Sequence, residues 1–401
     1  MWIKVGGKNA VEIEDEVVKR ILTFYPEEEL MSLKDFEEAF IVGSITISKL
    51  KKKSEAIFIP WQMFFLTSEN LEKEFLKIEK LRIDKFPDVA LLVKRKGQGE
   101  VTSRRVLDRL LRVQNFVSSG SGLPSNTFCG SLKAKNPREC ADFITNYFNV
   151  DITKFRKATA KIDDSLKYIS ERIQSRNINI SSGVLSNGML LNHQVVKGKI
   201  YKNTSGFAIR DEKIPFIFLP SEINPDEVSY RQIYTLLYLL VAIGLEQYDY
   251  FVESGFSYKK LQGQNMNQKM IHRIVSEFLL PVRETEPLRG VLIGKELLDE
   301  FKIKYKMSPT AILTTLRIRR IIDDALYEEL KPADFVPGPQ TNGSPRKPAK
   351  ISTSVLKFCG GVSFSIINTA IKNSALNSIP AQYLIFGRVR IKKYKEYLLQ
   401  I

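Results

Sequence analysis

The centre of the chain contains four stretches, GFAI (206–209), IPFIFLP (214–220), RQIYTLLYLLVAIGL (231–245) and NQKMIHRIVSEFLLP (267–281). The first two are short, apolar and separated by polar residues, which predicts strands at 206–209 and 214–219. The other two are long enough for helices, which we expect at about 229–245 and 266–280, the second ending before Pro281. These elements form the predicted core of the protein.

The stretch 233–245 is the most apolar part of the chain, and its apolar residues cover every side of the predicted helix. It is shorter than the roughly 20 residues that a helix needs to cross a bilayer. A helix that is apolar all round is normally enclosed by protein. We therefore expect a buried core helix and no membrane as a partner.

Most elements predicted before this core are helices. In the first 70 residues, apolar side chains recur every three or four positions, which is typical of helices and of a small helix-turn-helix module. The helices predicted from this spacing lie at 16–25, 33–40, 46–57, 103–116, 137–147 and 161–176. Two further strands are predicted at 178–180 and 199–201.

The sequence after the core again predicts a helix, a turn and a helix. The turn falls at about 304–307, and Ser308 and Pro309 have the residue types that cap and open a second helix. Residues 331–350 contain five prolines and two glycines, which is typical of an extended linker. A basic helical tail follows. The predicted fold class is therefore α+β and mostly helical, with a small central sheet.

The composition is that of an ordinary globular protein, because 43% of the 401 residues are hydrophobic and 26% are charged. Its three scattered cysteines do not make a disulfide framework or a zinc knuckle, which favours a cytoplasmic location. The net charge of +16 is concentrated in residues 51–200 (+12) and 301–401 (+11). Such basic blocks are typical of proteins that bind nucleic acids or acidic partners.

The four central stretches, in this order, resemble the ImmA/IrrE metallopeptidase family. That family has a GFA-like strand, an I-F-L-N strand, a helix of the form FTLaHELgH and a second helix ending in FLlP. The stretches 46–66 and 83–116 and the C-terminal helices are similar to long family members, which carry an N-terminal helix-turn-helix-like domain. The resemblance implies a zincin-like peptidase-type domain flanked by helical modules.

The implied domains are a helix-turn-helix-like domain (1–70), a basic connecting segment (71–135), a degenerate peptidase-like domain (136–290), helix-turn-helix-like helices (291–335), a linker (336–350) and a basic helical tail (351–401).

The resemblance also implies that the metal site of the family is lost. In the family, two histidines four residues apart and a glutamate on the next helix hold zinc, and a glutamate after the first histidine is the general base. These positions fall on Tyr238, Ala242, Gln268 and Leu239, respectively. Leucine and alanine neither bind zinc nor transfer a proton. We therefore expect no catalytic residue, no metal and no cofactor, and we interpret the chain as a pseudo-peptidase.

His272 lies one helical turn after Gln268, on the same predicted face. We interpret it as a partly buried histidine with one hydrogen-bond partner, because no cluster of His, Cys or carboxylates near it has the spacing of metal ligands. Glu246 and Glu277 are too few to build a site, and we expect both to lie at the surface.

Basic residues are the remaining functional candidates, since phosphates are neutralised by Lys and Arg. Their alternative role is to form solvated faces or to lie near helix C-termini. Arg105, Arg109 and Arg112 recur at helical spacing and predict one basic stripe. The nucleic-acid-binding candidates are Lys51, Lys52, Lys53, Arg104, Arg105, Arg109, Arg112, Arg317, Arg319, Arg320, Arg388 and Arg390.

Three functions follow as hypotheses. The first is a non-catalytic interaction protein that binds a repressor-like or toxin-like protein, in toxin–antitoxin, phage or mobile-element regulation, and that also has DNA or RNA as a candidate partner. It rests on the resemblance, since active family members cut repressor-type transcription factors. The second is a DNA-binding transcriptional regulator that uses one of its helix-turn-helix modules. The third is an enzyme with a relocated site, for which the sequence offers no nucleophile, base and orienting group together.

Overall fold

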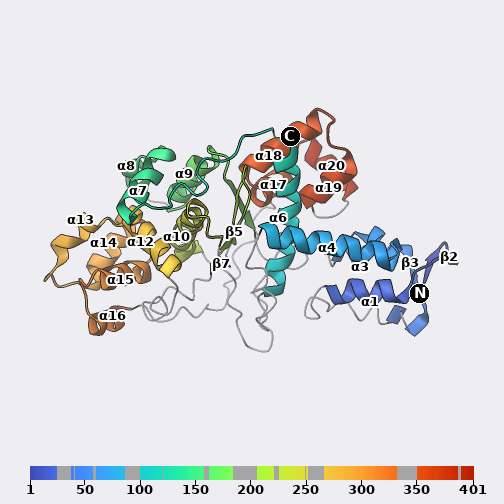
Figure 1. Ribbon diagram of the computed structural model, residues 1–401, viewed down its shortest axis with the longest axis horizontal. Coiled ribbons are helices and arrows are strands. Elements are labelled where there is room, and N and C mark those ends of the chain that lie inside the picture. Colours follow the sequence, from blue (N-terminus) through green and yellow to red (C-terminus); the bar gives the residue numbers. More distant parts are fainter. Residues whose placement is uncertain are drawn as a thin grey trace. The chain divides into compact units, whose positions relative to one another are not determined.

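The computed structural model describes residues 1–24, 38–39, 41–56, 60–85, 100–120, 122–157, 162–183, 206–220, 225–248, 250–251, 266–331, 350–386 and 390–401 (Figure 1). These residues are mostly helical and form two small sheets, in agreement with the predicted α+β class. It divides into two compact units. The first unit comprises Met1–Ser119, Val184–Asn203 and Ile366–Ile401, and the second comprises Gly120–Gly183 and Thr204–Ser365.

The first unit begins with a three-stranded sheet that the sequence-based prediction of helices missed. Strands β1 (Trp2–Val5) and β2 (Lys8–Glu12) form an antiparallel hairpin, and β3 (Ser44–Thr46) pairs in parallel with β1. Gly6 and Gly7 both have positive φ, +57° and +83°, which glycine adopts without steric cost and which a tight hairpin turn requires. The two glycines therefore account for the hairpin.

Helices complete the first unit. The apolar faces of those within residues 15–85 meet the sheet in one cluster, which includes Ile3, Val17, Leu50, Phe64 and Phe75. The helix predicted at 33–40 lies almost entirely outside the described residues. The helical elements are α1 (Asp15–Phe24), α3 (Ile47–Ala56), η2 (Trp61–Phe65), α4 (Ser68–Lys85), α6 (Glu100–Gly120), α19 (Ser378–Phe386) and α20 (Ile391–Leu398).

A buried ion pair joins α4 to α6 in the first unit. The guanidinium of Arg82 donates two hydrogen bonds of 2.6 Å to the carboxylate of Asp108. It also lies over the ring of Phe24, 4.9 Å from the ring centre. Only 1% of the Arg82 side chain and 11% of the Asp108 side chain is exposed. Two-point contacts of this kind orient as well as bind, so this pair fixes the two helices against each other.

The second unit is built on a four-stranded sheet in the order β4-β6-β5-β7. Its strands are β4 (Asn179–Gly183), β5 (Gly206–Ile209), β6 (Phe216–Pro220) and β7 (Tyr250–Phe251). β4 is parallel to β6, whereas β5 is antiparallel to both of its neighbours. The strands predicted at 206–209 and 214–219 are confirmed, and the one predicted at 199–201 lies outside the described residues.

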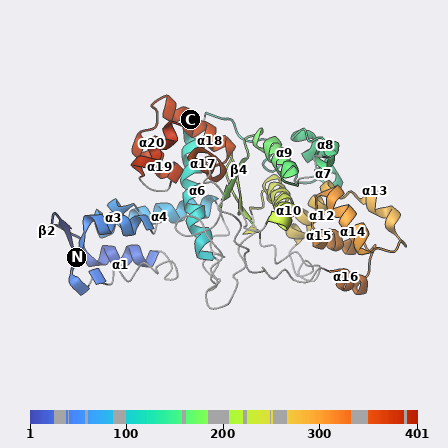
Figure 2. The ribbon, with the colours of Figure 1, turned by 180° about the vertical axis from the view of Figure 1, so that it is seen from behind.

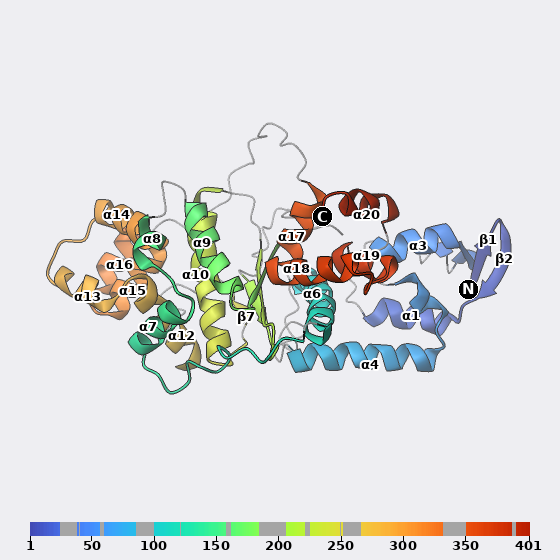
Figure 3. The ribbon, with the colours of Figure 1, turned by 90° about the horizontal axis from the view of Figure 1, so that it is seen from above.

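Helix α10 (Pro225–Gly244) is the central element of the second unit. It packs on β5 and β6 and also contacts α9 (Ile162–Gln174) and α12 (Met266–Leu279). Figures 1 and 3 show α9 and α10 side by side. Helix α12 also packs on α7 (Pro137–Tyr147). The predicted bounds of α7, 137–147, are confirmed at both ends. Asn136 caps α7 in a capping box with Glu139, a purely local signal.

The second unit contains further helices before and after α12. They are α8 (Ile152–Lys157), α13 (Val282–Thr285), η4 (Glu286–Leu288), α14 (Lys295–Tyr305), α15 (Pro309–Ile318), α16 (Asp324–Leu330) and α17 (Ile351–Cys359). The predicted cap is confirmed, because the Ser308 hydroxyl accepts from the backbone N–H of Ala311. Helix α18 (Gly361–Lys372) starts in the second unit and belongs to the first unit from Ile366.

None of the helices in the described part of the chain is by itself long and apolar enough to cross a membrane. Helices α17 and α18 meet that criterion only when taken together, across a bend of 120°.

Candidate functional site

The helix that would carry the zinc ligands is enclosed, as the sequence predicts. Every residue from 233 to 245 is buried. Tyr238, Leu239 and Ala242, at the first-histidine, general-base and second-histidine positions, are 2%, 0% and 0% exposed. Gln268, at the third-ligand position on α12, is half-buried. Three of the four positions therefore belong to the hydrophobic core of the second unit.

Leu239 fills the space between α10 and the sheet. A Cβ atom placed on Gly206 of β5 would lie 3.0 Å from Leu239 Cδ1 and 3.1 Å from Thr235 Cγ2. It would lie only 2.7 Å from the carbonyl oxygen of Phe218 on β6. Helix and sheet are therefore in close contact at the general-base position, and the side chain there is part of the packing.

Tyr238 faces His272 across the interface between α10 and α12. Their ring centres are 5.0 Å apart and their planes are tilted by 54°. The hydroxyl of Tyr234, one turn earlier on α10, is hydrogen-bonded to Nδ1 of His272 at 2.9 Å. The structure thus brings His272 next to Tyr238, as its place on the face of Gln268 suggests. His272 is only 1% exposed and is more deeply buried than predicted.

Burial keeps this cluster neutral. It lowers the pKa of His272 to about 3 and raises the pKa of Tyr234 well above its ordinary value of 10. A neutral phenol is a poor zinc ligand, and Leu239 and Ala242 offer no donor atom. Among the described residues, no group of three or more His, Cys, Asp or Glu side chains is placed to hold a metal ion. The properties of this cluster therefore favour a role in packing over a role in metal binding.

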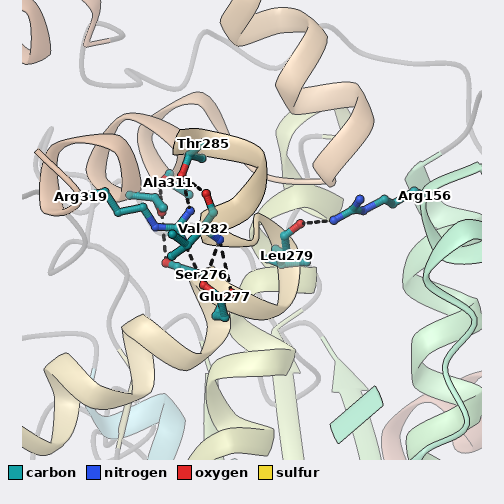
Figure 4. A network of polar contacts seen from close by, with 9 residues as sticks. Arg156, Ser276, Glu277, Leu279, Val282, Thr285, Ala311 and Arg319 are labelled. Carbon is teal, nitrogen blue, oxygen red and sulfur yellow. Dashed lines mark hydrogen bonds and ion pairs between the residues drawn. The ribbon is translucent and has the colours of Figure 1, made fainter. Parts of the chain in front are cut away.

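A second polar network ties the end of α12 to α15 (Figure 4). The Glu277 carboxylate accepts from the backbone N–H of Val282 at 3.1 Å and from Arg319 at 3.2 Å. Arg319 also donates to the hydroxyl of Thr285 at 3.0 Å. The prediction that Glu277 lies at the surface was wrong, since its side chain is 12% exposed. The ion pair with Arg319, which is distant in the sequence, offsets the cost of burying the Glu277 carboxylate.

Glu284 forms a related clamp in α13. It accepts from Arg156 of α8 at 2.7 Å and from the hydroxyl of Tyr305 of α14 at 2.6 Å. Burial raises the pKa of Glu284, but the hydrogen bonds from Tyr305 and Arg156 and the charge of Arg156 outweigh it and lower that pKa to about 2. Arg156 also donates to the carbonyl of Leu279 at 3.1 Å (Figure 4). The two networks hold α8, α12, α14 and α15 together as one body.

The helix-turn-helix pattern of α14 and α15 is present, but α15 is not placed as a recognition helix. A recognition helix lies in the major groove and presents its outer face to the bases. Residues 311–316 of α15 are all buried. Arg317 donates two hydrogen bonds, 2.8 and 2.9 Å, to Asp324, and Arg319 is paired with Glu277. These two arginines therefore stabilise the second unit, and Arg320 alone of the three is exposed.

The other basic candidates have mixed surroundings. Lys51 lies over the ring of Trp61, 4.4 Å from its centre, and Lys52 is exposed. Arg109 donates to the carbonyl of Ile385 in α19, so the predicted stripe on α6 faces a neighbouring helix at that point. Arg112 and Arg390 are half-buried. Arg388 and the side chains of Lys53, Arg104 and Arg105 lie outside the described residues.

The basic run at 388–395, which the sequence also marks as a candidate for binding nucleic acid, places three exposed lysines on α20. Lys392, Lys393 and Lys395 are exposed, whereas Tyr394 and Tyr397 on the same helix are buried. The alternation of lysines with tyrosines at three-residue spacing is a helical signal that identifies the exposed face. This face carries three positive charges on one short helix.

None of the protein-family models, curated proteins and solved structures compared with this chain matches it.

Proposed function

We propose that this chain is a non-catalytic interaction protein built on a zinc-free ImmA/IrrE-like pseudo-peptidase domain. It acts in the cytoplasm by binding a repressor-like or toxin-like protein, in toxin–antitoxin, phage or mobile-element regulation. The order of two strands, α10 and α12 agrees with the motif order on which the resemblance rests. The partner class comes from that resemblance, because active family members act on repressor-type proteins.

One observation carries the non-catalytic part of this proposal. Leu239 stands at the general-base position and is in contact with the strand that carries Gly206. A peptidase needs an open position on its metal for water and substrate, and a carboxylate to take a proton from that water. A leucine packed between helix and sheet supplies neither. A relocated metal site receives no support from the described residues, among which no group of three or more His, Cys, Asp or Glu side chains is placed to hold a metal ion.

The purified protein should carry no stoichiometric zinc. Tyr238, Ala242 and Gln268 replace the three ligands, and the ring next to Tyr238 is the neutral, deeply buried His272. Elemental analysis after purification without added metal measures this directly. About one zinc per chain, retained through mild chelation, would overturn the proposal.

Co-expression with the products of adjacent genes, followed by size-exclusion chromatography, tests whether the chain binds a protein partner. A complex that elutes as one peak supports the interaction role.

Nucleic-acid binding is the second candidate function, and we place it on the first unit. The observation that favours this unit is a contrast between candidate residues: the basic runs of the first unit present exposed lysines, whereas two candidate arginines of the second unit are held in ion pairs. Lys52 of α3 and Lys392, Lys393 and Lys395 of α20 are exposed. Arg317 and Arg319 of the second unit are engaged with Asp324 and Glu277. Phosphate contact requires side chains that can reach the ligand, which the lysines can.

Duplex binding through these lysines should weaken steeply with salt, with a log–log slope near −0.9 for each contacted phosphate. Reversing Lys52, Lys392 and Lys393 to Glu should weaken binding to all sequences alike. The matched control reverses Lys295, Lys350 and Lys357, three exposed lysines of the second unit, with the same change in net charge. Fluorescence anisotropy at about 50 mM salt, where phosphate contacts are strong, measures both variants. Equal losses in the two variants would show that only net charge matters.

A further inference from the structure

The junction between α17 and α18 is a sharp elbow, residues 359–363, at the β4 edge of the sheet that the described residues form in the second unit. α17 ends at Cys359, α18 begins at Gly361, and their axes are bent by 120°. β4 is the outermost strand in the order β4-β6-β5-β7, and α17 packs on it (Figure 2). An outermost strand has backbone groups that no other strand pairs with.

The elbow lies against this edge of β4. The backbone N–H of Asn179 donates to the carbonyl of Pro215 at 2.9 Å, on the β6 side. Because alternate residues of a strand in a parallel ladder bond to opposite sides, the N–H and C=O of Ile180 point away from β6. A Cβ atom on Gly360 would lie 2.6 Å from the carbonyl oxygen of Ile180. Gly360, with a φ of +81°, therefore covers the edge where a further strand would pair.

Side chains from β4 and α9 hold the elbow in place. The Asn179 side chain donates to the carbonyl of Cys359 at 2.7 Å and accepts from the backbone N–H of Ser363 at 3.0 Å. The backbone N–H of Gly361 donates to the Gln174 side chain at 2.6 Å. The first N–H groups of a helix have no partner within the helix. The start of α18 is therefore capped only while the elbow is docked on Asn179 and Gln174.

The docked elbow also contains a polar group that docking leaves unsatisfied. Ser363 is 0% exposed, and its hydroxyl has no hydrogen-bond partner among the described residues. A buried hydroxyl without a partner favours any state in which water can reach it. Three hydrogen bonds thus favour docking, whereas Ser363 favours release. Because these contributions oppose each other, the free-energy difference between the docked and the released elbow is reduced, as reversible opening requires.

We propose that the elbow is a reversible cap on the edge of β4. When docked, it prevents an extended polypeptide from pairing with Ile180. When released, it leaves an edge of the kind that accepts an added strand. α18 continues from Ile366 into the first unit, so the cap is covalently joined to that unit. The inference goes beyond the proposed function and does not depend on the family resemblance.

Two substitutions in the elbow should shift this equilibrium in opposite directions. Gly360→Ala places a methyl group 2.5 Å from the Asn179 side chain and 2.6 Å from the Ile180 carbonyl, which forces release. Ser363→Ala removes the unsatisfied hydroxyl and keeps the backbone N–H that docks. Hydrogen exchange at single-residue resolution then reports on the amides of Gly361, Ser363 and Ile180, with the Leu280 amide, bonded to Ser276, as the core reference.

The Gly361, Ser363 and Ile180 amides should exchange about tenfold faster or more in Gly360→Ala and about tenfold slower in Ser363→Ala, the change expected for one ordinary hydrogen-bonding group. The Leu280 amide should be unchanged. The proposal is wrong if Ser363→Ala leaves elbow exchange unchanged or accelerates it. It is also wrong if Ile180 does not follow the elbow, or if the Leu280 amide accelerates to the same extent. Should Gly360→Ala not fold, the Ser363→Ala result alone decides.

Discussion

Replacing Leu239 by alanine should lower the free energy of unfolding by about 2–5 kcal/mol, the range for deleting a fully buried leucine side chain. Leu239 is 0% exposed and lies between α10 and β5, where Gly206 comes close to its methyl group. Both surfaces are parts of regular elements that cannot easily collapse into the space left behind. The cost should therefore fall in the upper part of that range.

Urea unfolding followed by circular dichroism measures this loss. The control is Leu292→Ala, in the same unit, because the Leu292 side chain is 90% exposed and its removal should change stability by no more than about 0.5 kcal/mol. If Leu239→Ala lowered the free energy of unfolding by no more than Leu292→Ala does, Leu239 would lie in an open cleft and would not be part of the core packing.

Replacing Glu277 by alanine should lower the free energy of unfolding by about 3–5 kcal/mol, because it leaves the buried charge of Arg319 without its carboxylate partner. Arg319 is 11% exposed and Glu277 is 12% exposed. The substitution also removes the acceptor for the N–H of Val282, where α12 passes into α13. Burial lowers the pKa of Arg319, and the negative charges of Glu277 and Glu286 oppose that shift.

The same short run of arginines offers a matched control. Arg317 pairs with Asp324, whose side chain is 70% exposed, so Asp324→Ala should cost less than about 1 kcal/mol. Thermal unfolding of both variants gives the comparison. Equally small losses of stability in the two variants would mean that Arg319 does not depend on Glu277 and is available to another partner. Residues 317–320 would then again be candidates for binding nucleic acid.

Local signals made part of the fold predictable. Asn136, Pro137 and Glu139 lie within one turn and set the start of α7, and Ser308 with Pro309 sets the start of α15. The apolar run of α10 also sufficed to predict its enclosure, because no face of that helix suits water. Gly6 and Gly7 were an equally local hairpin signal, which the helical spacing of the following residues obscured.

Long-range pairing was beyond the sequence. Arg319 and Glu277 are 42 positions apart, and nothing in either neighbourhood shows that they meet. Asn179 and Cys359 are 180 positions apart, so the elbow at Gly360 could not be foreseen. The approach of His272 to Tyr238 was predictable only through the family resemblance, which placed the two positions at one site. Charge counts likewise could not separate exposed lysines from arginines used in ion pairs.

We propose that three of the four positions that correspond to the metal site of the resembled family, Tyr238, Leu239 and Ala242, serve as hydrophobic core. Restoring the family residues with Tyr238→His, Leu239→Glu, Ala242→His and Gln268→Glu tests it most directly. Glu at position 239 would face the contact with Gly206, and an unpaired buried charge costs several kcal/mol. The hydrogen-bonding groups that orient histidine ligands are not expected to be in place.

The deciding measurement is the melting temperature of this fourfold variant, with and without zinc, beside the wild type. We predict a fall of about 10 °C or more, since each kcal/mol lowers the melting temperature by roughly 2–4 °C in a domain of this size. We also predict that zinc does not reverse it. Melting at the wild-type temperature without zinc, or recovery with one bound zinc per chain, would show an open cleft that still has the shape of a metal site, and would contradict the account.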